Sequence, residues 1–176
     1  WDQPIDGSNL NLWIKWKQDL LNAINIKVPR CYKTTTAEPL NIQLHIFADA
    51  SELGYGCVAY LRTQYSKENC DVSFVFGKSR TAPLKATTIP RLELQAATLA
   101  VRVSKMIQSE IEFEISNVIF WTDSKTILGY INNESRRFHT YVANRVAEIH
   151  RESSKTQWRH CPGSLNPADD ASRGLK

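Results

Sequence analysis

The chain has 176 residues, of which 42% are hydrophobic and 23% are charged. This length is sufficient for one domain with its own core, and the composition is ordinary for a globular protein. The formal net charge of +4 permits a polyanionic partner without requiring one. Because the sequence contains no signal peptide and no apolar run long enough to span a bilayer, we expect no membrane association.

The cysteines indicate a reducing compartment and no zinc site. None of them forms a C-x-x-C pair, which argues against zinc. Cys57 lies in an apolar run and is interpreted as a small core residue. Because the chain begins at Trp1 and its one methionine is Met106, we expect it to be a piece of a longer polypeptide.

Residues 1–40 are predicted to form a separate N-terminal segment. Its apolar side chains recur at helical spacing and predict a helix over about residues 9–26. Two prolines and a run of three threonines then form a linker. The D-G-S at residues 6–8 imitates a catalytic acidic motif, but it precedes a helix and follows no strand. We interpret it as a turn and a helix cap.

From residue 41 the period of the apolar side chains changes to that of a strand. Leu44, Ile46 and Ala48 alternate with polar residues, which predicts a first strand. Two further apolar segments, Cys57–Leu61 and Val72–Phe76, follow after short turns. Three consecutive strands with short connections predict an antiparallel meander.

The second half of the chain is predicted to alternate helices with two short strands. Pro90 stands in the first turn of a long amphipathic helix, and Val118–Trp121 reads as a buried strand. Helices are predicted over about residues 124–132 and 138–152, a strand over 156–159, and a last helical turn from 166. The order β-β-β-α-β-α-α-β-α predicts an α/β domain over residues 41–176 with helices packed on a mixed sheet.

Acidic motifs stand where strands are predicted to end or helices to begin. They are F-A-D-A-S with Asp49, R-L-E-L-Q-A-A with Glu93, W-T-D-S with Asp123, and N-P-A-D-D-A-S-R-G with Asp169 and Asp170. Carboxylates gathered at one point repel each other unless cations lie between them. Hard oxygen ligands suit Mg²⁺ or Mn²⁺, and two such ions can drive phosphodiester cleavage. The leading hypothesis is therefore a nuclease.

Each of these carboxylates also has an ordinary structural interpretation. Asp49 suits a turn, Glu93 the start of a helix, and Asp123 a helix N-cap. The other two acids suit a first helical turn. Three of the positions adjoin buried apolar segments, where an acid needs a partner. No lysine or arginine inside those segments supplies one, so the set taken together favours a site.

These motifs together resemble the ribonuclease H region of the Pao/BEL retrotransposon polyproteins, over nearly the whole chain. The W-D-Q-P at the start and the later I-K-V-P-R-C-Y are similar to that family's segment between reverse transcriptase and ribonuclease H. The K-S-R, T-I-P-R-L-E-L, N-P-A-D and A-S-R-G motifs add to the match. The resemblance implies a ribonuclease H-like fold, with a mixed five-stranded sheet of three antiparallel strands, parallel additions and flanking helices.

The resemblance also implies an enzyme that cuts the RNA strand of RNA–DNA hybrids with two Mg²⁺ ions, or with Mn²⁺, during reverse transcription. By matching motifs, Asp49 would bridge both ions, and Glu93 and Asp123 would hold the ion on the leaving-group side. Asp169 would hold the ion that activates the attacking water. Counting back from the A-S-R motif favours Asp169, whereas counting forward from N-P-A favours Asp170, which is the reserve ligand.

Substrate contacts are predicted around these carboxylates. The candidate residues are Ser51, Lys78, Arg80, Arg91 and Ser124. An A-form hybrid is recognised through its backbone and 2′-hydroxyl groups, so the basic side chains would meet phosphates, although a solvated basic loop is the commoner arrangement. His160 precedes a proline that the mobile histidine of many ribonucleases H would follow, so we interpret it as a strand-end residue.

The expected partners are an RNA–DNA hybrid and the adjoining reverse transcriptase domain of the same polyprotein, inside cytoplasmic virus-like particles. A catalytically inactive module of the same fold, binding nucleic acid or serving a structural role, stays open as the alternative. The presence of all four acidic positions argues against it. An aspartic peptidase would need D-T-G or D-S-G, which the sequence lacks, and an integrase would need a D-D-E pattern and usually a zinc module.

Overall fold

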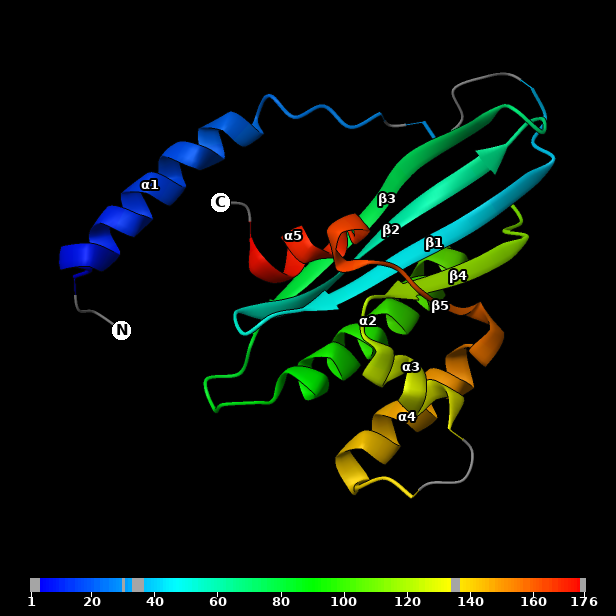
Figure 1. The fold of residues 1–176 in the computed structure, drawn as a ribbon. Helices are drawn as coiled ribbons and strands as arrows, with labels where there is room; N and C mark the ends of the chain where they lie inside the picture. Colours follow the sequence, from blue (N-terminus) through cyan, green and yellow to red (C-terminus); the bar gives the residue numbers. More distant parts are fainter. Residues whose placement is uncertain (1–3, 30, 33–36, 134–136, 175–176) are drawn as a thin grey trace. The chain divides into compact units, whose positions relative to one another are not determined.

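The computed structural model describes residues 4–29, 31–32, 37–133 and 137–174 (Figure 1). The chain falls into two compact units, Trp1–Cys31 and Tyr32–Lys176. The predicted domain boundary, after residue 40, lies a little further along the chain and stays a prediction. Within the described ranges, no helix combines the length and the apolarity that crossing a membrane would require.

The smaller unit consists mainly of helix α1, Gly7–Ala23, which confirms the predicted helix. Its apolar side chains are exposed, and none of the residues of the helix is buried. The rings of Trp13 and Trp16 stack with their centroids 4.9 Å apart. Asp6 occupies the N-cap position, but its side chain makes no capping hydrogen bond, so the predicted cap is not formed.

The larger unit is built on one mixed sheet of five strands. They are β1 (Asn41–Ala50), β2 (Gly54–Gln64), β3 (Cys70–Thr81), β4 (Asn117–Thr122) and β5 (Trp158–His160). Their order in the sheet is β3-β2-β1-β4-β5. The first three strands are antiparallel, whereas β4 runs parallel to β1 and β5 runs parallel to β4. This is the predicted meander with parallel additions.

Helices cover the two faces of this sheet unequally. The helices are α2 (Ile89–Glu110), α3 (Lys125–Asn132), α4 (Thr140–Glu152) and α5 (Ala168–Arg173). The first three lie on one face, and the short α5 lies on the other (Figure 1). The strand predicted over residues 156–159 begins later, because a capping box between Ser154 and Gln157 winds Lys155–Gln157 into a 3₁₀ turn before β5.

The core lies between the sheet and α2. Leu44 and Ile46 project from β1 and are fully buried, as the alternation of the sequence predicts. Leu92 and Leu94 at the start of α2 are also almost inaccessible to solvent. Burial of this stripe fixes α2 along the sheet and thereby determines where its first turn lies.

A glycine allows α5 to pack directly on the other face. A Cβ atom added to Gly56 in β2 would lie 2.9 Å from the Cβ atom of Ala171, which is closer than real Cβ contacts. Gly56 is the register partner of Asp49 in β1. The close approach therefore brings α5 against the end of β1, where Asp49 stands.

Candidate active site

The parallel pairing of β1 and β4 brings two aspartates to one edge of the sheet. Ala48 and Thr122 are register partners, and Asp49 and Asp123 are the next residues along each strand direction. Because the carboxyl ends of parallel strands meet at the same edge, the two side chains become neighbours. Glu93, in the first turns of α2, and Asp169, in α5, approach this edge from the helices.

Asp49 is buried, with an exposed fraction of 5%, and is bound to α5. The hydroxyl of Ser172 donates a short hydrogen bond to its carboxylate. The hydroxyl of Ser51 donates in turn to the backbone carbonyl of Ser172, at 2.7 Å. These two hydrogen bonds hold the end of β1 and the end of α5 together.

Two of the carboxylates, Asp49 and Glu93, have a raised pKa. Burial raises the pKa of Asp49 to about 6, the hydrogen bond from Ser172 opposes that rise, and the charges of Asp123 and Asp169 add to it. Burial likewise raises the pKa of Glu93, against the hydrogen bond from Ser124 and with the charge of Asp123. The charge of Asp123 thus acts on both Glu93 and Asp49, and the charge of Asp169 acts on Asp49.

Glu93 is oriented by the first turn of α3. The hydroxyl of Ser124 donates to the Glu93 carboxylate at 2.7 Å and accepts a hydrogen bond from the backbone N–H of Ile127 at 3.2 Å. Arg91, two residues earlier, lies over the ring of Tyr141 at 5.2 Å and forms no ion pair with Glu93. Ser124, rather than a cation, therefore holds Glu93 in place.

The two adjacent aspartates of α5 lie in different surroundings. Asp169 is within electrostatic range of Asp49, and its carboxylate accepts a hydrogen bond from Arg173 Nε at 2.6 Å. Asp170 is exposed; burial, with a further contribution from the charge of Asp170, raises the pKa of Tyr60 in β2. The geometry directs Asp169, and not Asp170, toward the other acids.

The donor chemistry of this edge fits a hard divalent cation. The carboxylates are oxygen ligands, and their mutual electrostatic effect is one that a cation would relieve. Among the described residues, however, no three His, Cys, Asp or Glu side chains lie close enough together to hold a metal ion. Ser172 donates a hydrogen bond to Asp49, and Arg173 donates one to Asp169. These side chains would have to rearrange before the acids could bind one metal ion together. The predicted metal ligands stay predictions.

The residues predicted to contact substrate separate into two kinds. Ser51 and Ser124 are buried and bonded to other parts of the site, so they position its elements. Lys78 and Arg80 are exposed on the edge strand β3, and Arg91 is exposed on α2. Contact of these three basic side chains with a substrate stays a prediction.

The segment after β5 also contributes residues that the sequence did not single out. The Nδ2 atom of Asn166 donates to the carbonyl of Ala48 at 3.1 Å, and its Oδ1 atom accepts from the N–H of Ala168 at 3.1 Å. A Cβ atom on Gly163 would lie 3.0 Å from Asp123 Oδ2. An Asn before a helix is a capping signal, and this signal predicts the hydrogen bond to Ala168. Nothing in the sequence predicts the hydrogen bond to Ala48. His160 is exposed at the end of β5, where it was expected.

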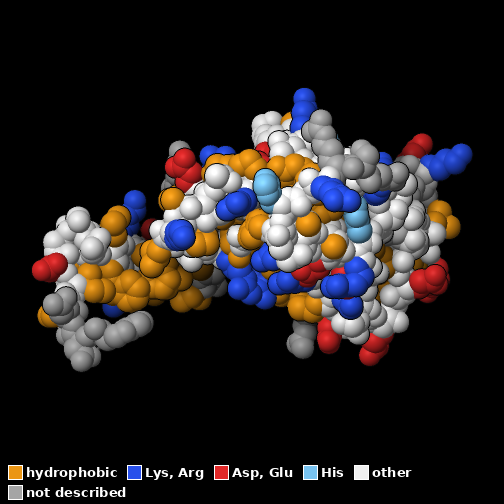
Figure 2. Space-filling model, turned by 90° about the horizontal axis from the view of Figure 1, so that it is seen from below, with side chains coloured by type: hydrophobic (Ala, Val, Ile, Leu, Met, Phe, Trp, Pro, Cys, Tyr) orange, Lys and Arg blue, Asp and Glu red, His pale blue; other side chains and the backbone are white. Residues whose placement is uncertain are grey.

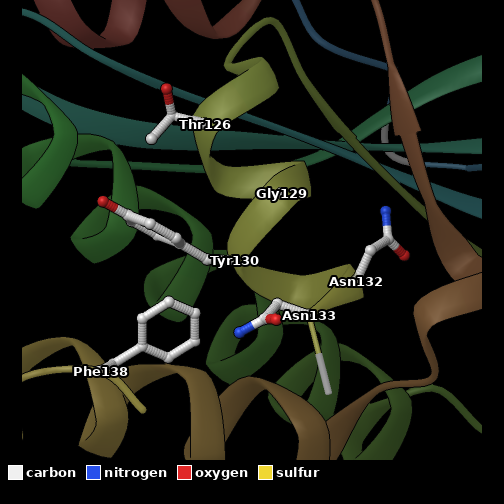
Figure 3. A pocket seen from close by; sticks show the side chains of 6 residues that line it. All are labelled: Thr126, Gly129, Tyr130, Asn132, Asn133 and Phe138. Carbon is white, nitrogen blue, oxygen red and sulfur yellow. The ribbon is translucent and has the colours of Figure 1, made fainter. Parts of the chain in front are cut away.

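A pocket of about 420 Å³ lies at the end of α3. Figure 3 shows the side chains that line it, which are those of Thr126, Tyr130, Asn132, Asn133 and Phe138, around Gly129. No carboxylate or histidine is among them. This pocket is therefore separate from the acidic edge and offers no comparable chemistry.

Comparison with known proteins identifies the family of the chain. The model of the Pao retrotransposon-like RNaseH-like domain matches residues 1–124. No curated protein matches the sequence.

Among solved structures, the N-terminal RNase H domain of rv2228c from Mycobacterium tuberculosis, fused to maltose binding protein, superposes with a TM-score of 0.54 at 13% identity. The superposition covers 75% of this chain and 91% of that one, and it shows the fold. RNase H1 from Halobacterium salinarum NRC-1 gives a TM-score of 0.47 at 12% identity, over 74% of this chain and 93% of that one. LC11-RNase H1, solved in complex with an RNA/DNA hybrid, gives 0.48 at 15% identity over the same shares. The chain belongs to the Pao retrotransposon-like ribonuclease H-like family.

Proposed function

We propose that this domain is a metal-dependent endonuclease that cleaves the RNA strand of RNA–DNA hybrids during reverse transcription of a retrotransposon. One observation carries the proposal: acids at the ends of β1 and β4 and in α2 and α5 lie at one edge of a ribonuclease H-like sheet, where burial and the charges of neighbouring acids raise the pKa of Asp49 and of Glu93. A purely structural set of carboxylates would be expected to have basic partners, and only Asp169 has one among the described residues.

Asp49, Glu93, Asp123 and Asp169 are the residues that would hold the divalent ions in this proposal. Bound at such a site, Mg²⁺ or Mn²⁺ supplies an activated water and stabilises the charge that develops on the leaving oxygen. Around these ligands, Ser172 orients Asp49 and Ser124 orients Glu93. Arg173 neutralises part of the charge of Asp169.

The proposal extends to the partners and the location of the domain. The substrate is an RNA–DNA hybrid, and a reverse transcriptase domain of the same polyprotein supplies part of the affinity for it. Both would act in the cytoplasm, inside virus-like particles. Equal hybrid binding by this chain and by a chain that also includes the polymerase would contradict the contribution of the reverse transcriptase domain to affinity.

A second candidate is a catalytically inactive module of the same fold. The observation that favours it is the separation of the acids, since no three of them are close enough among the described residues to hold a metal ion. The pairing of Asp169 with Arg173 points the same way.

The experiment that separates the two candidates is cleavage of a labelled RNA–DNA hybrid by the purified chain with Mg²⁺ or Mn²⁺. Asp49→Asn is the test variant, and Glu114→Gln, at an exposed acid outside the site, is its matched control. Cleavage by the parent and by Glu114→Gln, but not by Asp49→Asn, supports the nuclease. Hybrid binding without cleavage, in both metals, supports the inactive module.

A further inference from the structure

Three arginines from three different elements line one small pocket. Arg80 comes from the end of β3, Arg102 from the middle of α2, and Arg145 from α4. Tyr55, Gln95 and Thr98 complete its polar lining. None of the carboxylates of the candidate active site takes part in it.

The fold dictates this convergence. Tyr55 and Arg80 are register partners in β2 and β3, so their side chains emerge on the same face of the sheet. Gln95, Thr98 and Arg102 are spaced three and four residues apart on α2 and therefore share one side of that helix. Arg145 reaches them because α4 packs against α2.

Tyr141, which is not itself a lining residue, contacts two of the side chains that line the pocket. The guanidinium of Arg145 lies over that ring, 4.7 Å from its centroid. Gln95 Nε2 donates to the Tyr141 hydroxyl at 2.8 Å. Two of the lining side chains are thus held in place before any ligand arrives, which lowers the entropic cost of binding.

Positive charge is in excess here. Arg102 is neutralised, since its Nε and Nη2 atoms donate to the two carboxylate oxygens of Glu148 at 2.5 and 2.9 Å. That pairing lowers the pKa of Glu148. Within the described parts of the chain, neither Arg80 nor Arg145 forms an ion pair, although Arg145 is half-buried. Figure 2 shows Lys and Arg side chains gathered in the middle of the face seen from below in Figure 1, the side on which α4 lies.

We propose that this arginine pocket binds a phosphate group. Guanidinium groups bind phosphate through paired, charge-assisted hydrogen bonds, and the Gln95 amide and the Tyr55 hydroxyl add neutral donors. The volume of about 150 Å³ equals that of roughly five water molecules, which suits a phosphate group and not a nucleoside. The phosphate belongs either to a nucleic-acid backbone or to a small phosphorylated ligand. The proposed binding of phosphate does not depend on whether the acidic edge cleaves RNA.

Two variants of the full chain test the pocket directly. Arg80→Gln removes an exposed arginine with no ion pair to lose, and Arg145→Gln removes the half-buried one. Arg151→Gln is the matched control, because Arg151 lies on the same helix, is exposed, and donates to Glu152 outside the pocket. Thermal unfolding of each variant checks its fold, and Arg80→Gln alone suffices if Arg145→Gln proves unstable.

The first probe is inorganic phosphate, titrated at low salt and followed by NMR at the side-chain amide of Gln95. The second is a short RNA–DNA hybrid, followed by fluorescence anisotropy in EDTA so that no cleavage occurs. We expect saturable phosphate binding by the parent and by Arg151→Gln, and about tenfold weaker binding by each pocket variant. If the source is a backbone phosphate, the pocket variants also weaken hybrid binding, and the slope of log affinity against log salt falls by about one.

Unchanged hybrid binding, with phosphate binding still lost, assigns the pocket to a small phosphorylated ligand and keeps the proposal. Absence of phosphate binding by the parent overturns it. Equal phosphate affinity in the parent and in both pocket variants overturns it as well. Because the binding assays contain no divalent metal, loss of phosphate binding can be distinguished from loss of RNA cleavage.

Discussion

The hydroxyl of Ser124 joins the first turn of α3 to the carboxylate of Glu93. It accepts from Ile127 N–H at 3.2 Å and donates to Glu93 Oε2 at 2.7 Å. One buried side chain therefore both caps a helix and orients a candidate ligand. The sequence suggested a cap at the neighbouring Asp123, but the structure places the capping side chain one residue later.

Ser124→Ala should lose both hydrogen bonds. We expect the free energy of unfolding to fall by about 1–2 kcal/mol, because an N-cap and a hydrogen bond to a charged group are removed together. Hybrid cleavage should fall by roughly tenfold or more, because Glu93 is no longer held. Urea unfolding and single-turnover cleavage measure the two effects. Ser124→Thr keeps a hydroxyl and should restore both, and cleavage by Ser124→Ala at the parental rate would contradict the orienting role.

The architecture of the larger unit could be predicted from local pattern. Alternation at Leu44 and Ile46 identifies β1, and Pro90 with the apolar stripe behind it identifies α2, because burial on one face leaves a period in the sequence. The extra length of β3 left no such trace. That edge strand is exposed along much of its length, so its polar residues resemble a loop.

The acids of the candidate site could be predicted as a group, since each adjoins the end of an element. Their partners could not. Ser172 meets Asp49 across a sequence separation of 123 residues, and the pocket arginines Arg102 and Arg145 meet only through the packing of α4 on α2. No short-range pattern encodes such contacts, because they depend on how closely two elements approach. The sequence likewise predicts helix α1, but it does not predict what the exposed apolar face of that helix contacts.

The raised pKa of Asp49 makes the stability of the metal-free protein depend on pH. In the unfolded chain this carboxyl has its ordinary pKa of 3.8, and in the folded chain about 6, so the folded state binds the proton more tightly. Stability must therefore decrease as the pH rises through that window and then level off. Asp49→Asn should be more stable than the parent by about 1–3 kcal/mol near pH 7.5, with the difference shrinking near pH 4. Urea unfolding at the two pH values measures this difference, with Glu114→Gln as the control for removing an acid outside the site.

Mg²⁺ should stabilise the folded protein if the acidic edge binds it. Binding to the folded state alone raises the unfolding free energy by about 2.7 kcal/mol at a hundredfold excess over Kd. Differential scanning calorimetry with and without Mg²⁺ would show a rise in Tm for the parent. Asp123→Asn should lose that rise, because Asp123 lies in electrostatic range of both Asp49 and Glu93. An equal rise in the variant would place the metal elsewhere.

Two glycine substitutions should have opposite effects on stability. A Cβ atom at position 56 meets Ala171 at 2.9 Å, so Gly56→Ala should push α5 off the sheet and cost about 1–3 kcal/mol. A Cβ atom at Gly129, inside α3, meets nothing within 4 Å. Gly129→Ala should therefore stabilise by about 0.5–1 kcal/mol through its higher helix propensity. Chemical unfolding of both variants measures the pair, and a neutral Gly56→Ala would mean that α5 is not packed tightly on β2.

The choice between the adjacent aspartates of α5 can be settled by a matched pair of variants. Asp169 lies in electrostatic range of Asp49, whereas Asp170 is exposed and lies in electrostatic range of Tyr60 in β2. Both substitutions, Asp169→Asn and Asp170→Asn, remove one negative charge from the same helical turn and so perturb the helix dipole alike. We expect Asp169→Asn to lower hybrid cleavage by about 100-fold or more, the scale of losing one electrostatic contact to a transition state. Asp170→Asn should stay within about threefold of the parent, as a surface charge does. The reverse order would assign the last ligand position to Asp170 in place of Asp169.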